Sequence, residues 1–491
     1  MATRILAPPK KVILNNLRLL SRPLNSVPPT FVAAIPGQFA AFEPAPSAAT
    51  TTKPSSLIDL TDPERLFSSV PTSKLIRSTA NLHAVAMEPV VDLGIRVMQS
   101  KLIMDTGLVR EAVLGVVRRT FYDHFCGGED TVEAAATVRQ LNEAGLRGML
   151  DYAVEDAEDN SSCDRNLEAF LHTVESARTL PHGYVSFVVV KITAICPIHL
   201  LRRVSDLLRW QKKNPSFNLP WNRYSFPILS DLTPLYHTLE EPQPLTAEEE
   251  ADLFLAHERL RTVGSKCEKY NIPLCIDAEY TAVQPAIDFF TYSAAMEHNR
   301  NEPIIYGTLQ AYLKDAKERL LLKSEAARKM GILMGVKLVR GAYMASEAKL
   351  AHSLGHESPI HNSIQETHDC YNDCASFMLE KVAGRSGAVV LATHNVESGQ
   401  LAVMKAKDMG ISNGNQRLEF AQLYGMADSF SFGLKNEGFQ VSKYMPFGPV
   451  DQVMPYLLRR AEENRGLLSA STLDRQLMRN ELWRRFRAAV L

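Results

Sequence analysis

Two short segments, far apart in the chain, carry side chains whose types and spacing fit the recognition of an anion. The first, residues 337–343 (KLVRGAY), is a β-prone apolar run ending in Gly341 and Ala342, small residues that would let a flat ligand approach the backbone. The second places Arg459 and Arg460 on a segment with helical apolar spacing, so their side chains point about 100° apart. Paired guanidinium groups commonly grip a carboxylate or a phosphate.

Glu463 follows the two arginines at spacings that make it a neighbour of both Arg459 and Arg460 on a helix. An isolated segment of this pattern also fits a ladder of solvated ion pairs, which needs no ligand. The choice between the two interpretations therefore depends on the elements that surround the segment.

Short β-prone runs, most of them followed by helical periodicity, predict those elements. The predicted strands are 148–154, 185–191, 272–277, 304–308, 336–339, 388–393, 418–423 and 440–445. Clear amphipathic helices are predicted at 166–178, 247–270, 310–329, 364–382 and 399–409. Alternation of strand and helix indicates a parallel sheet, and this number of units predicts an α/β fold of the (β/α)8 TIM-barrel type.

The predicted strand ends carry an unusual concentration of charged and hydrogen-bonding side chains. They are Glu155, Lys191, Asp277, Glu279, Gln310, Arg340, Thr393, His394, Asn395, Gln422 and Tyr444. In a barrel of this type the active site lies where strands end and loops begin. Stability alone gives no reason for such a concentration, so we predict a site at this end of the barrel.

Some of these side chains also have simpler interpretations. Lys191 ends an apolar run and needs a partner if buried; an ion pair with Asp277 on the next strand would supply one and is compatible with a substrate role. His394 fits a hydrogen-bonded histidine at a strand end. Tyr343 and Tyr444 fit core aromatics whose hydroxyls reach water.

Composition excludes several classes of function. The chain has 491 residues, 45% of them hydrophobic, and a formal net charge of −1, which argues against nucleic acid as the main partner. No run approaches the ~18 apolar residues of a membrane span. GxGxxG and Walker A motifs are absent, so any nucleotide would be held by barrel loops.

The seven scattered cysteines are typical of a reducing compartment. Cys370 and Cys374, with His361 and His368 nearby, provide no closed ligand set, and we predict no metal site.

The chain divides into segments of different composition. Residues 1–54 are basic, free of acidic residues before Glu43, and rich in Ser, Thr, Ala and Pro, as in an organelle transit peptide; an ordinary disordered tail is the alternative. Residues 55–145 predict a helical region and 146–491 the barrel. Within the barrel, 215–245 is an irregular, aromatic- and proline-rich insertion that could form a lid, and 472–491 is a C-terminal helix.

Eight segments, in order along the chain, resemble the flavin-dependent proline dehydrogenases. They are VVKITAI (189–195), IDAE (276–279), LQAY (309–312), KLVRGAYM (337–344), LATHN (391–395), EFAQLYGM (419–426), KYMPFGP (443–449) and YLLRRAEEN (456–464). With the N-terminal segment and the insertion, the chain resembles the mitochondrial form found in plants.

The resemblance implies a distorted barrel that binds FAD at the strand ends and oxidises L-proline to 1-pyrroline-5-carboxylate, the first step of proline degradation to glutamate. It implies transfer of the electrons to a quinone and a location in the mitochondrion, on the matrix side of the inner membrane. Because a quinone is lipid-soluble, peripheral contact with that membrane is a further expectation, through the C-terminal helix alone or with the aromatic insertion. Hydride transfer to a flavin requires neither a protein nucleophile nor a metal, and we assign no dedicated acid or base.

The resemblance also assigns roles to residues. The substrate carboxylate would lie between Lys191, Arg459 and Arg460, and Glu155 would pair with the first arginine in the closed site. Asp277 would hydrogen-bond to Tyr444, and the ring pocket would be lined by Ala342, Tyr343, Leu423, Tyr444 and Tyr456. Cofactor contacts would come from Gln310, Lys337, Val339, Thr393, His394, Arg460 and Glu463. Many bacterial members have Arg and Trp in place of Lys337 and Met344, so we expect altered contacts to the cofactor there.

Two other classes of function remain open at this point. A barrel aldolase or lyase would use Lys191 as a Schiff-base nucleophile. Such a protein would be colourless, and borohydride would trap the imine that it forms with its substrate. A barrel kept only as an interaction module would bind no flavin.

The C-terminal segment carries an apolar stripe in which Met478, Leu482, Phe486 and Val490 recur every four residues, with arginines around it. Such a helix either lies on an anionic membrane surface or docks its stripe on the barrel.

Overall fold

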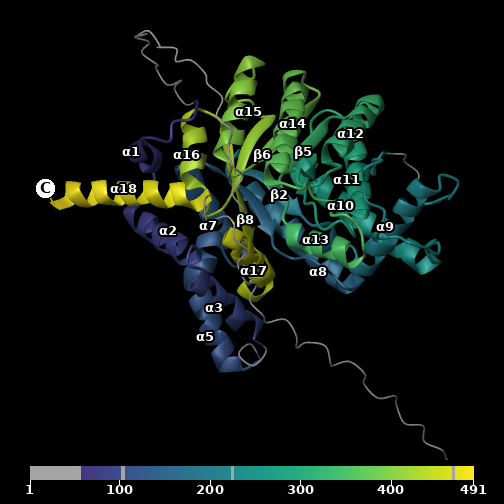
Figure 1. Cartoon of the computed structure of the whole chain (residues 1–491), viewed down its shortest axis with the longest axis horizontal. Helices are drawn as coiled ribbons and strands as arrows, with labels where there is room; N and C mark the ends of the chain where they lie inside the picture. The colour runs from purple at the N-terminus through teal and green to yellow at the C-terminus, as the bar shows by residue number, and fades with distance from the viewer. Residues whose placement is uncertain (1–56, 101–104, 223–225, 467–469, 491) are drawn as a thin grey trace, which may run out of the picture. The chain divides into compact units, whose positions relative to one another are not determined.

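The computed structural model describes residues 57–100, 105–222, 226–466 and 470–490, but not the side chains of residues 99 and 460–471 (Figure 1). The chain forms two units, 1–53 and 54–491, and only the second is described. The predicted transit peptide, residues 1–54, therefore lies outside the described residues.

A closed barrel of parallel strands forms the centre of the second unit. Neighbours in the barrel are neighbours in sequence, and the last strand pairs with the first. The strands are β1 (Arg147–Tyr152), β2 (Val185–Val190), β3 (Leu274–Ile276), β4 (Ile305–Gln310), β5 (Met334–Val339), β6 (Gly387–Ala392), β7 (Leu418–Leu423) and β8 (Gln440–Phe447). The predicted barrel and its eight strands are confirmed.

The barrel interior is built in layers by the period-two alternation of the strands. A compact apolar cluster fills it, made of Met149, Phe187, Val189, Cys275, Tyr306, Ala388, Val390 and Ala421. Moving two residues along a strand keeps a side chain on the same face. Asp151, Lys191 and Asp277 therefore follow Met149, Val189 and Cys275 on the inner face, one layer nearer the carboxyl ends of the strands.

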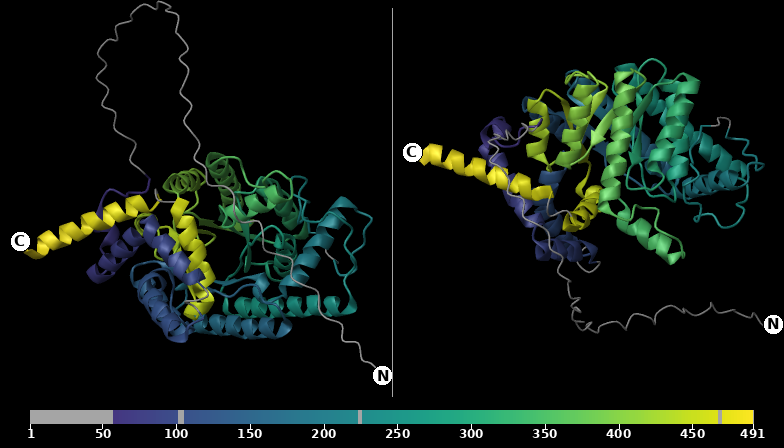
Figure 2. Two further views of the ribbon diagram at one scale, coloured as in Figure 1. Left: turned by 60° about the horizontal axis from the view of Figure 1, so that its bottom comes forward. Right: turned by 45° about the horizontal axis from the view of Figure 1, so that its top comes forward.

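Helices surround the strands on the outside (Figures 1 and 2). They are α7 (Thr131–Glu143), α8 (Asn160–Thr179), α9 (Ile198–Lys213), α10 (Ala247–Tyr270), α11 (Gln284–His298), α12 (Ala316–Met330), α13 (Met344–Ser353), α14 (Ile364–Ala383), α15 (Val396–Asp408) and α16 (Asp428–Asn436). The predicted helix 247–270 is confirmed, with a capping box formed by Thr246 and Glu249 at its start. The predicted helix 310–329 begins too early, because Gln310 is the last residue of β4 and pairs with Val339.

The N-terminal part of the described chain is helical. It contains α1 (Pro63–Phe67), α2 (Thr72–Val85), α3 (Glu88–Gln99), α5 (Gly107–Val117), the π-helix η1 (Arg118–Tyr122) and α6 (Asp123–Phe125). α7 contacts β1 and α8, α3 contacts α17 (Val450–Gly466), and α2 contacts α18 (Ala470–Val490). The N-terminal helices therefore pack on the barrel and on the two C-terminal helices.

The insertion between α9 and α10 has no helix or strand in its described residues. Trp221 meets Phe289 edge to face, with ring centroids 5.3 Å apart, and Phe226 stacks on Tyr292 at 4.4 Å. Both partners lie on α11. These contacts fasten the insertion to the helical surface, while its suggested role as a lid stays a prediction.

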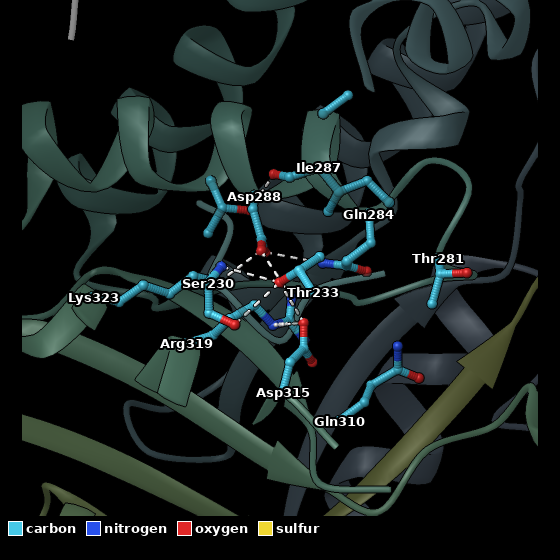
Figure 3. Close-up of polar contacts among 12 residues, drawn as sticks. Ser230, Thr233, Thr281, Gln284, Ile287, Asp288, Gln310, Asp315, Arg319 and Lys323 are labelled. Atoms are coloured by element: carbon cyan, nitrogen blue, oxygen red, sulfur yellow. Dashed lines mark hydrogen bonds and ion pairs between the residues drawn. The ribbon is translucent and has the colours of Figure 1, made fainter. Parts of the chain in front are cut away.

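A buried ionic cluster continues this attachment onto α12 (Figure 3). Thr233 of the insertion donates to Asp315 at 2.6 Å, and Asp315 lies 3.2 Å from the Arg319 guanidinium. Asp288 on α11 accepts from both Arg319, at 3.2 Å, and Lys323, at 2.6 Å. The insertion is thus joined to two barrel helices by polar contacts as well as by aromatic packing.

The C-terminal helix α18 divides its apolar stripe between two environments. Leu477 and Met478 are buried, whereas Trp483, Phe486 and Val490 are 60%, 59% and 68% exposed. The helix packs against α1, α2 and α16, and its contacts with α1 and α2 continue as far as Arg485, whereas its last turn extends beyond them (Figure 1). Each of the two predicted uses of the stripe therefore fits one part of the stripe. No helix in the described ranges is long and apolar enough to cross a bilayer.

Candidate active site

Five side chains, three on strands β1, β5 and β8 and two directly after β2 and β3, form a buried polar network in the inner layer of the barrel. Lys191 Nζ lies 3.2 and 3.3 Å from the two carboxylate oxygens of Asp151. The Tyr444 hydroxyl lies 2.7 Å from Asp151 Oδ2 and 2.7 Å from Asp277 Oδ2. Lys337 donates to Asp277 Oδ1, and its Nζ lies 4.9 Å from the centroid of the Tyr444 ring. The predicted hydrogen bond between Asp277 and Tyr444 is confirmed.

The predicted ion pair between Lys191 and Asp277 is wrong. Lys191 forms an ion pair with Asp151, on the neighbouring strand β1. Asp277 forms an ion pair with Lys337 instead. Because β2 lies between β1 and β3, both carboxylates were within reach of the lysine. The sequence prediction gave Asp151 no role, although its position two residues after Met149 places it on the inner face.

Burial and neighbouring charges act in opposite directions on the two carboxyls. Burial raises the pKa of Asp151, and the Lys191 ammonium offsets this only in part. Burial also disfavours ionisation of Asp277, but Lys337 and Lys191 outweigh it and leave its pKa below the usual value. The Lys191 pKa is raised, because the carboxylates around it together outweigh its own desolvation. Lys191 is therefore a charged ammonium group in a buried position.

Helix α17 brings Arg459 to the mouth of the barrel. Its Nη1 lies 2.7 Å from Glu155 Oε1, just beyond β1, and its guanidinium lies 5.8 Å from the ring centroid of Tyr343, just beyond β5. The predicted pair between Glu155 and Arg459 is confirmed. Burial works against ionisation of Glu155, but Arg459 outweighs it and lowers the pKa of the carboxyl. Tyr456, one turn earlier, is buried.

The side chains of Arg460 and Glu463, both predicted to contact ligands, lie outside the described residues. The backbone of α17 includes both positions. Their roles stay predictions.

The turn after β5 is shaped by a contact within the protein. Gly341 has a φ of +140°, and a Cβ at this position would lie 2.0 Å from a ring carbon of Tyr312. The close approach expected for a flat ligand is thus made here by Tyr312. Ala342 and Tyr343 are half-buried, and Met344 is exposed.

Hydrogen bonds join the end of β4 to the loop after β3, and the end of β6 to β7 and to the loop after β5. Gln310 donates to the Glu279 carbonyl at 2.9 Å, and His394 Nε2 accepts from the Leu423 backbone N–H at 3.1 Å. Thr393 accepts from Arg340 at 2.7 Å. The simpler interpretation of His394, a hydrogen-bonded histidine at a strand end, therefore fits its geometry. Val339 and Leu423 are the last residues of β5 and β7.

Arg340 is the side chain at this rim best suited to an anionic group. Its guanidinium contacts His368, Thr393 and Ser398 at 3.0, 2.7 and 2.8 Å, and lies 4.3 Å from the ring centroid of Tyr371. Burial and Arg340 lower the pKa of His368, so all four partners are neutral. Among the residues that the structure describes, no carboxylate pairs with Arg340. This half-buried cation fits a cofactor that carries phosphate groups.

Two further buried carboxylates hold the loop after β3. Glu279 contacts the Thr193 hydroxyl at 2.9 Å, and burial raises its pKa to about 8. Glu347 on α13 accepts from the Thr281 backbone N–H at 2.6 Å and from its hydroxyl at 2.5 Å. The sequence prediction named Glu279 without a role and missed Glu347, because an acidic residue in a first helical turn fits an exposed position equally well.

The insertion contributes to this connection through His237. Its Nε2 lies 2.8 Å from the Thr281 hydroxyl, which also contacts Glu347. Burial, with a smaller contribution from Arg209, lowers the pKa of His237 to about 3, so the ring is neutral. Since the Thr281 hydroxyl donates to Glu347, it accepts from the Nε2–H tautomer of His237. The insertion is thereby linked to α13, which begins next to Tyr343.

We expect Glu347→Ala to lower kcat/KM, by up to about 100-fold, mainly through a higher KM. The change leaves the Thr281 N–H without its acceptor and releases α13, with a loss of stability of about 1–3 kcal/mol. Steady-state kinetics and urea unfolding measure both effects. Glu357→Ala, in the loop after α13 with a side chain 96% exposed, is the control and should change neither quantity. An unchanged KM in Glu347→Ala would contradict the positioning of Tyr343 through this contact.

Comparison with known proteins agrees with this geometry. A family model described as proline dehydrogenase matches residues 134–472. Proline dehydrogenase 2, mitochondrial, of Arabidopsis thaliana is 59% identical over 440 residues, which are 89% of this chain and 92% of that protein. Proline dehydrogenase 1, mitochondrial, of the same plant is 59% identical over 437 residues, with 88% and 87% covered.

More distant proteins are similar over most of the chain. Human hydroxyproline dehydrogenase is 31% identical over 430 residues, which are 84% of this chain and 91% of that protein. The crystal structure of proline utilization A (PutA) from Bdellovibrio bacteriovorus, inactivated by N-propargylglycine, superposes with a TM-score of 0.59 at 20% identity. The match covers 85% of this chain but only 40% of that one, and it shows the shared fold. On the family match and on the two plant relatives, the chain belongs to the proline dehydrogenase family.

Proposed function

We propose that this chain oxidises L-proline to 1-pyrroline-5-carboxylate with FAD as the hydride acceptor and a quinone as the final electron acceptor. Family membership makes it a flavin oxidoreductase that acts on proline, the first step of proline catabolism. FAD itself, the quinone and the residue roles are the proposed part. The observation that carries the residue roles is that two cations, the buried Lys191 and the half-buried Arg459, both act on the Glu155 carboxyl at the barrel mouth.

Lys191, Arg459 and Arg460 are proposed to hold the substrate carboxylate. Lys191 is 6% exposed and points into the layer below the mouth, while Arg459 reaches the mouth from α17. A carboxylate between them would gain charge-assisted hydrogen bonds in a place with little water, where such bonds are strong. Without substrate, Glu155 pairs with Arg459. When the substrate binds, Arg459 would leave Glu155 or contact both carboxylates.

The proposed ring pocket lies between the same elements. The Arg459 guanidinium lies over the ring face of Tyr343. Tyr444 would form the bottom of the pocket, where Asp151 and Asp277 hold its hydroxyl. Ala342, Leu423 and Tyr456 would complete the walls. These side chains orient the ring and exclude water, and the nearby cations lower the pKa of the substrate amine, which must lose its proton before oxidation.

The flavin, when bound, supplies the electron sink that accepts a hydride from the carbon next to the proline nitrogen. Arg340 is proposed to hold its anionic part. Gln310, Lys337, Val339, Thr393 and His394, with Arg460 and Glu463, are the other proposed contacts. Lys337 reaches this role from the inner layer, where Asp277 keeps it charged despite burial and raises its pKa.

The protonation of Lys191 disfavours the alternative of a Schiff-base aldolase or lyase. A Schiff-base lysine must be a neutral amine to attack a carbonyl, and its pKa is normally lowered by burial. Here the carboxylates around Lys191 outweigh its burial and raise its pKa instead. Incubation with proline and an artificial quinone should yield a cyclic imine that an aromatic amino-aldehyde traps. Absence of the imine would contradict the proposed reaction, whereas inactivation by borohydride with a carbonyl substrate would favour the alternative.

The mitochondrion is the compartment in which the two plant relatives are named, and the same location is assigned to this chain. A matrix-facing position at the inner membrane and a transit peptide in residues 1–54 are the proposed refinements, supported by the basic, acid-free composition of that segment. A fluorescent reporter fused to residues 1–53 should reach mitochondria, and a cytosolic reporter would contradict the transit peptide.

Peripheral contact with the membrane is proposed for the outer half of α18. Trp483, Phe486 and Val490 are exposed there, with Arg487 5.8 Å from the Trp483 ring centroid. We expect the double change Trp483→Ala, Phe486→Ala to weaken co-sedimentation with anionic liposomes at least about tenfold. Leu473→Ala, which removes an exposed apolar side chain near the start of the helix, is the control. Equal binding by wild type and the double variant would exclude this face.

The arginines of α18 are poor choices for the same test. Arg485 donates to the carbonyls of Phe67 and Val70 at 2.7 and 2.8 Å and to the Thr72 hydroxyl at 3.0 Å. Arg484 lies 3.0 Å from Glu64. Removing these side chains would loosen the docking of the helix on α1 and α2 and confound any loss of lipid binding.

A further inference from the structure

The hydroxyl of Tyr444 meets two carboxyl groups at once. It lies 2.7 Å from an oxygen of Asp151 and 2.7 Å from an oxygen of Asp277. A phenol has a single hydrogen and can donate to only one of them. If both carboxyls were ionised, the other contact would bring two oxygens together with no hydrogen between them, in a buried place where such a contact is costly. A second proton is therefore required in this network.

The geometry indicates which carboxyl carries that proton. Asp277 has the closer cation, since Lys337 donates directly to its Oδ1, whereas Lys191 lies 3.2 Å or more from Asp151. Asp151 is also fully buried, with 0% of the residue exposed, against 9% for Asp277. Burial raises the pKa of Asp151, while Lys337 and Lys191 lower the pKa of Asp277. Both shifts agree with the geometry in placing the proton on Asp151.

We propose that Asp151 is a neutral carboxylic acid at neutral pH and is a positioning residue that joins Lys191 to Tyr444. Lys191 donates to Asp151 Oδ1, and the Asp151 hydroxyl donates to the Tyr444 oxygen. Tyr444 then donates to Asp277 Oδ2, and Lys337 donates to Asp277 Oδ1. With this one proton added, each of these contacts joins a donor to an acceptor.

The proton changes the charge that the site offers to a substrate. Two lysines and two ionised aspartates would sum to zero, whereas a neutral Asp151 leaves the network with one net positive charge. That charge resides on Lys191, because Asp277 offsets Lys337. A neutral acid therefore holds Lys191 in place without cancelling the charge that would attract a carboxylate. This consequence for substrate binding rests on the role proposed for Lys191, whereas the protonation state does not.

Infrared difference spectroscopy tests the protonation state without any turnover. The purified holoenzyme should show the carbonyl stretch of a protonated carboxylic acid, shifted in deuterated water and missing from Asp151→Asn. A difference spectrum between wild type and Asp151→Asn that contains only ionised carboxylate bands would overturn the proposal. Since proline is not involved, this result is independent of the proposed function.

Kinetics of matched substitutions test the positioning role. Asp151→Ala should raise KM for proline roughly 30-fold or more. Asp151→Asn should recover most of that loss, because its amide oxygen can accept from Lys191 and its N–H can donate to Tyr444. Asp277→Asn should not recover activity relative to Asp277→Ala, since Asp277 accepts from both Tyr444 and Lys337 and an amide nitrogen cannot. If Asp151→Asn is as impaired as Asp151→Ala, or if Asp277→Asn recovers instead, the assignment of the proton to Asp151 is wrong.

Discussion

Arg459→Met should lower kcat/KM for proline about 30- to 1000-fold while the flavin stays bound. The estimate corresponds to the loss of a charge-assisted bidentate contact, about 2–4 kcal/mol. Methionine keeps much of the apolar stem that packs beside Tyr343, so the helix should remain in place. The effect should fall mainly on KM, measured by steady-state kinetics with an artificial quinone.

Two further variants make this result interpretable. Glu155→Gln removes the charge that holds Arg459 but leaves the guanidinium, so its effect on KM should be much smaller. Arg261→Met, on α10 with a side chain 58% exposed, removes an arginine that pairs with surface carboxylates and should leave kinetics unchanged. A value of kcat/KM near that of wild type in Arg459→Met would remove this residue from the substrate site.

Asp277→Ala should both destabilise the protein and abolish most of its activity. The change removes the acceptor of two buried donors, Lys337 and the Tyr444 hydroxyl. Breaking a buried ion pair by removing one partner costs about 3–5 kcal/mol, because an uncompensated charge stays in the interior. Urea unfolding should show this loss as a lower midpoint with little change in slope.

The matched control for this prediction is an ion pair on the surface. Asp373 and Lys317 lie 2.7 Å apart, with side chains 57% and 55% exposed. Asp373→Ala should hardly change the unfolding midpoint, because exposed pairs contribute little. If Asp277→Ala unfolds at the wild-type midpoint, the network in the barrel does not carry the buried charges assigned to it.

The strands were predictable because buried parallel strands are short apolar runs bounded by polar residues. What the sequence could not provide was the pairing across the barrel. Lys337 lies on β5 and Asp277 directly after β3, with β4 between them, and their contact follows from closure of the barrel rather than from any sequence spacing. Lys191 had two possible carboxylate neighbours, and the prediction chose the wrong one.

Other differences have similarly local causes. The helix predicted from 310 begins at Ala316, because the apolar residues that end β4 continue into helical spacing by chance. The apolar stripe of α18 is continuous in sequence, but only its first part, at Leu477 and Met478, is buried against other helices. Asp151 interrupts an apolar strand and resembles a surface position until the alternation of inner and outer faces is known.

The visible absorption spectrum of the purified protein, recorded anaerobically before and after addition of proline, shows whether the cations of this barrel present proline to a bound flavin. We expect a flavin spectrum that bleaches when proline is added, and much slower bleaching for Arg459→Met. A colourless protein, or a flavin whose absorption proline leaves unchanged, would contradict it.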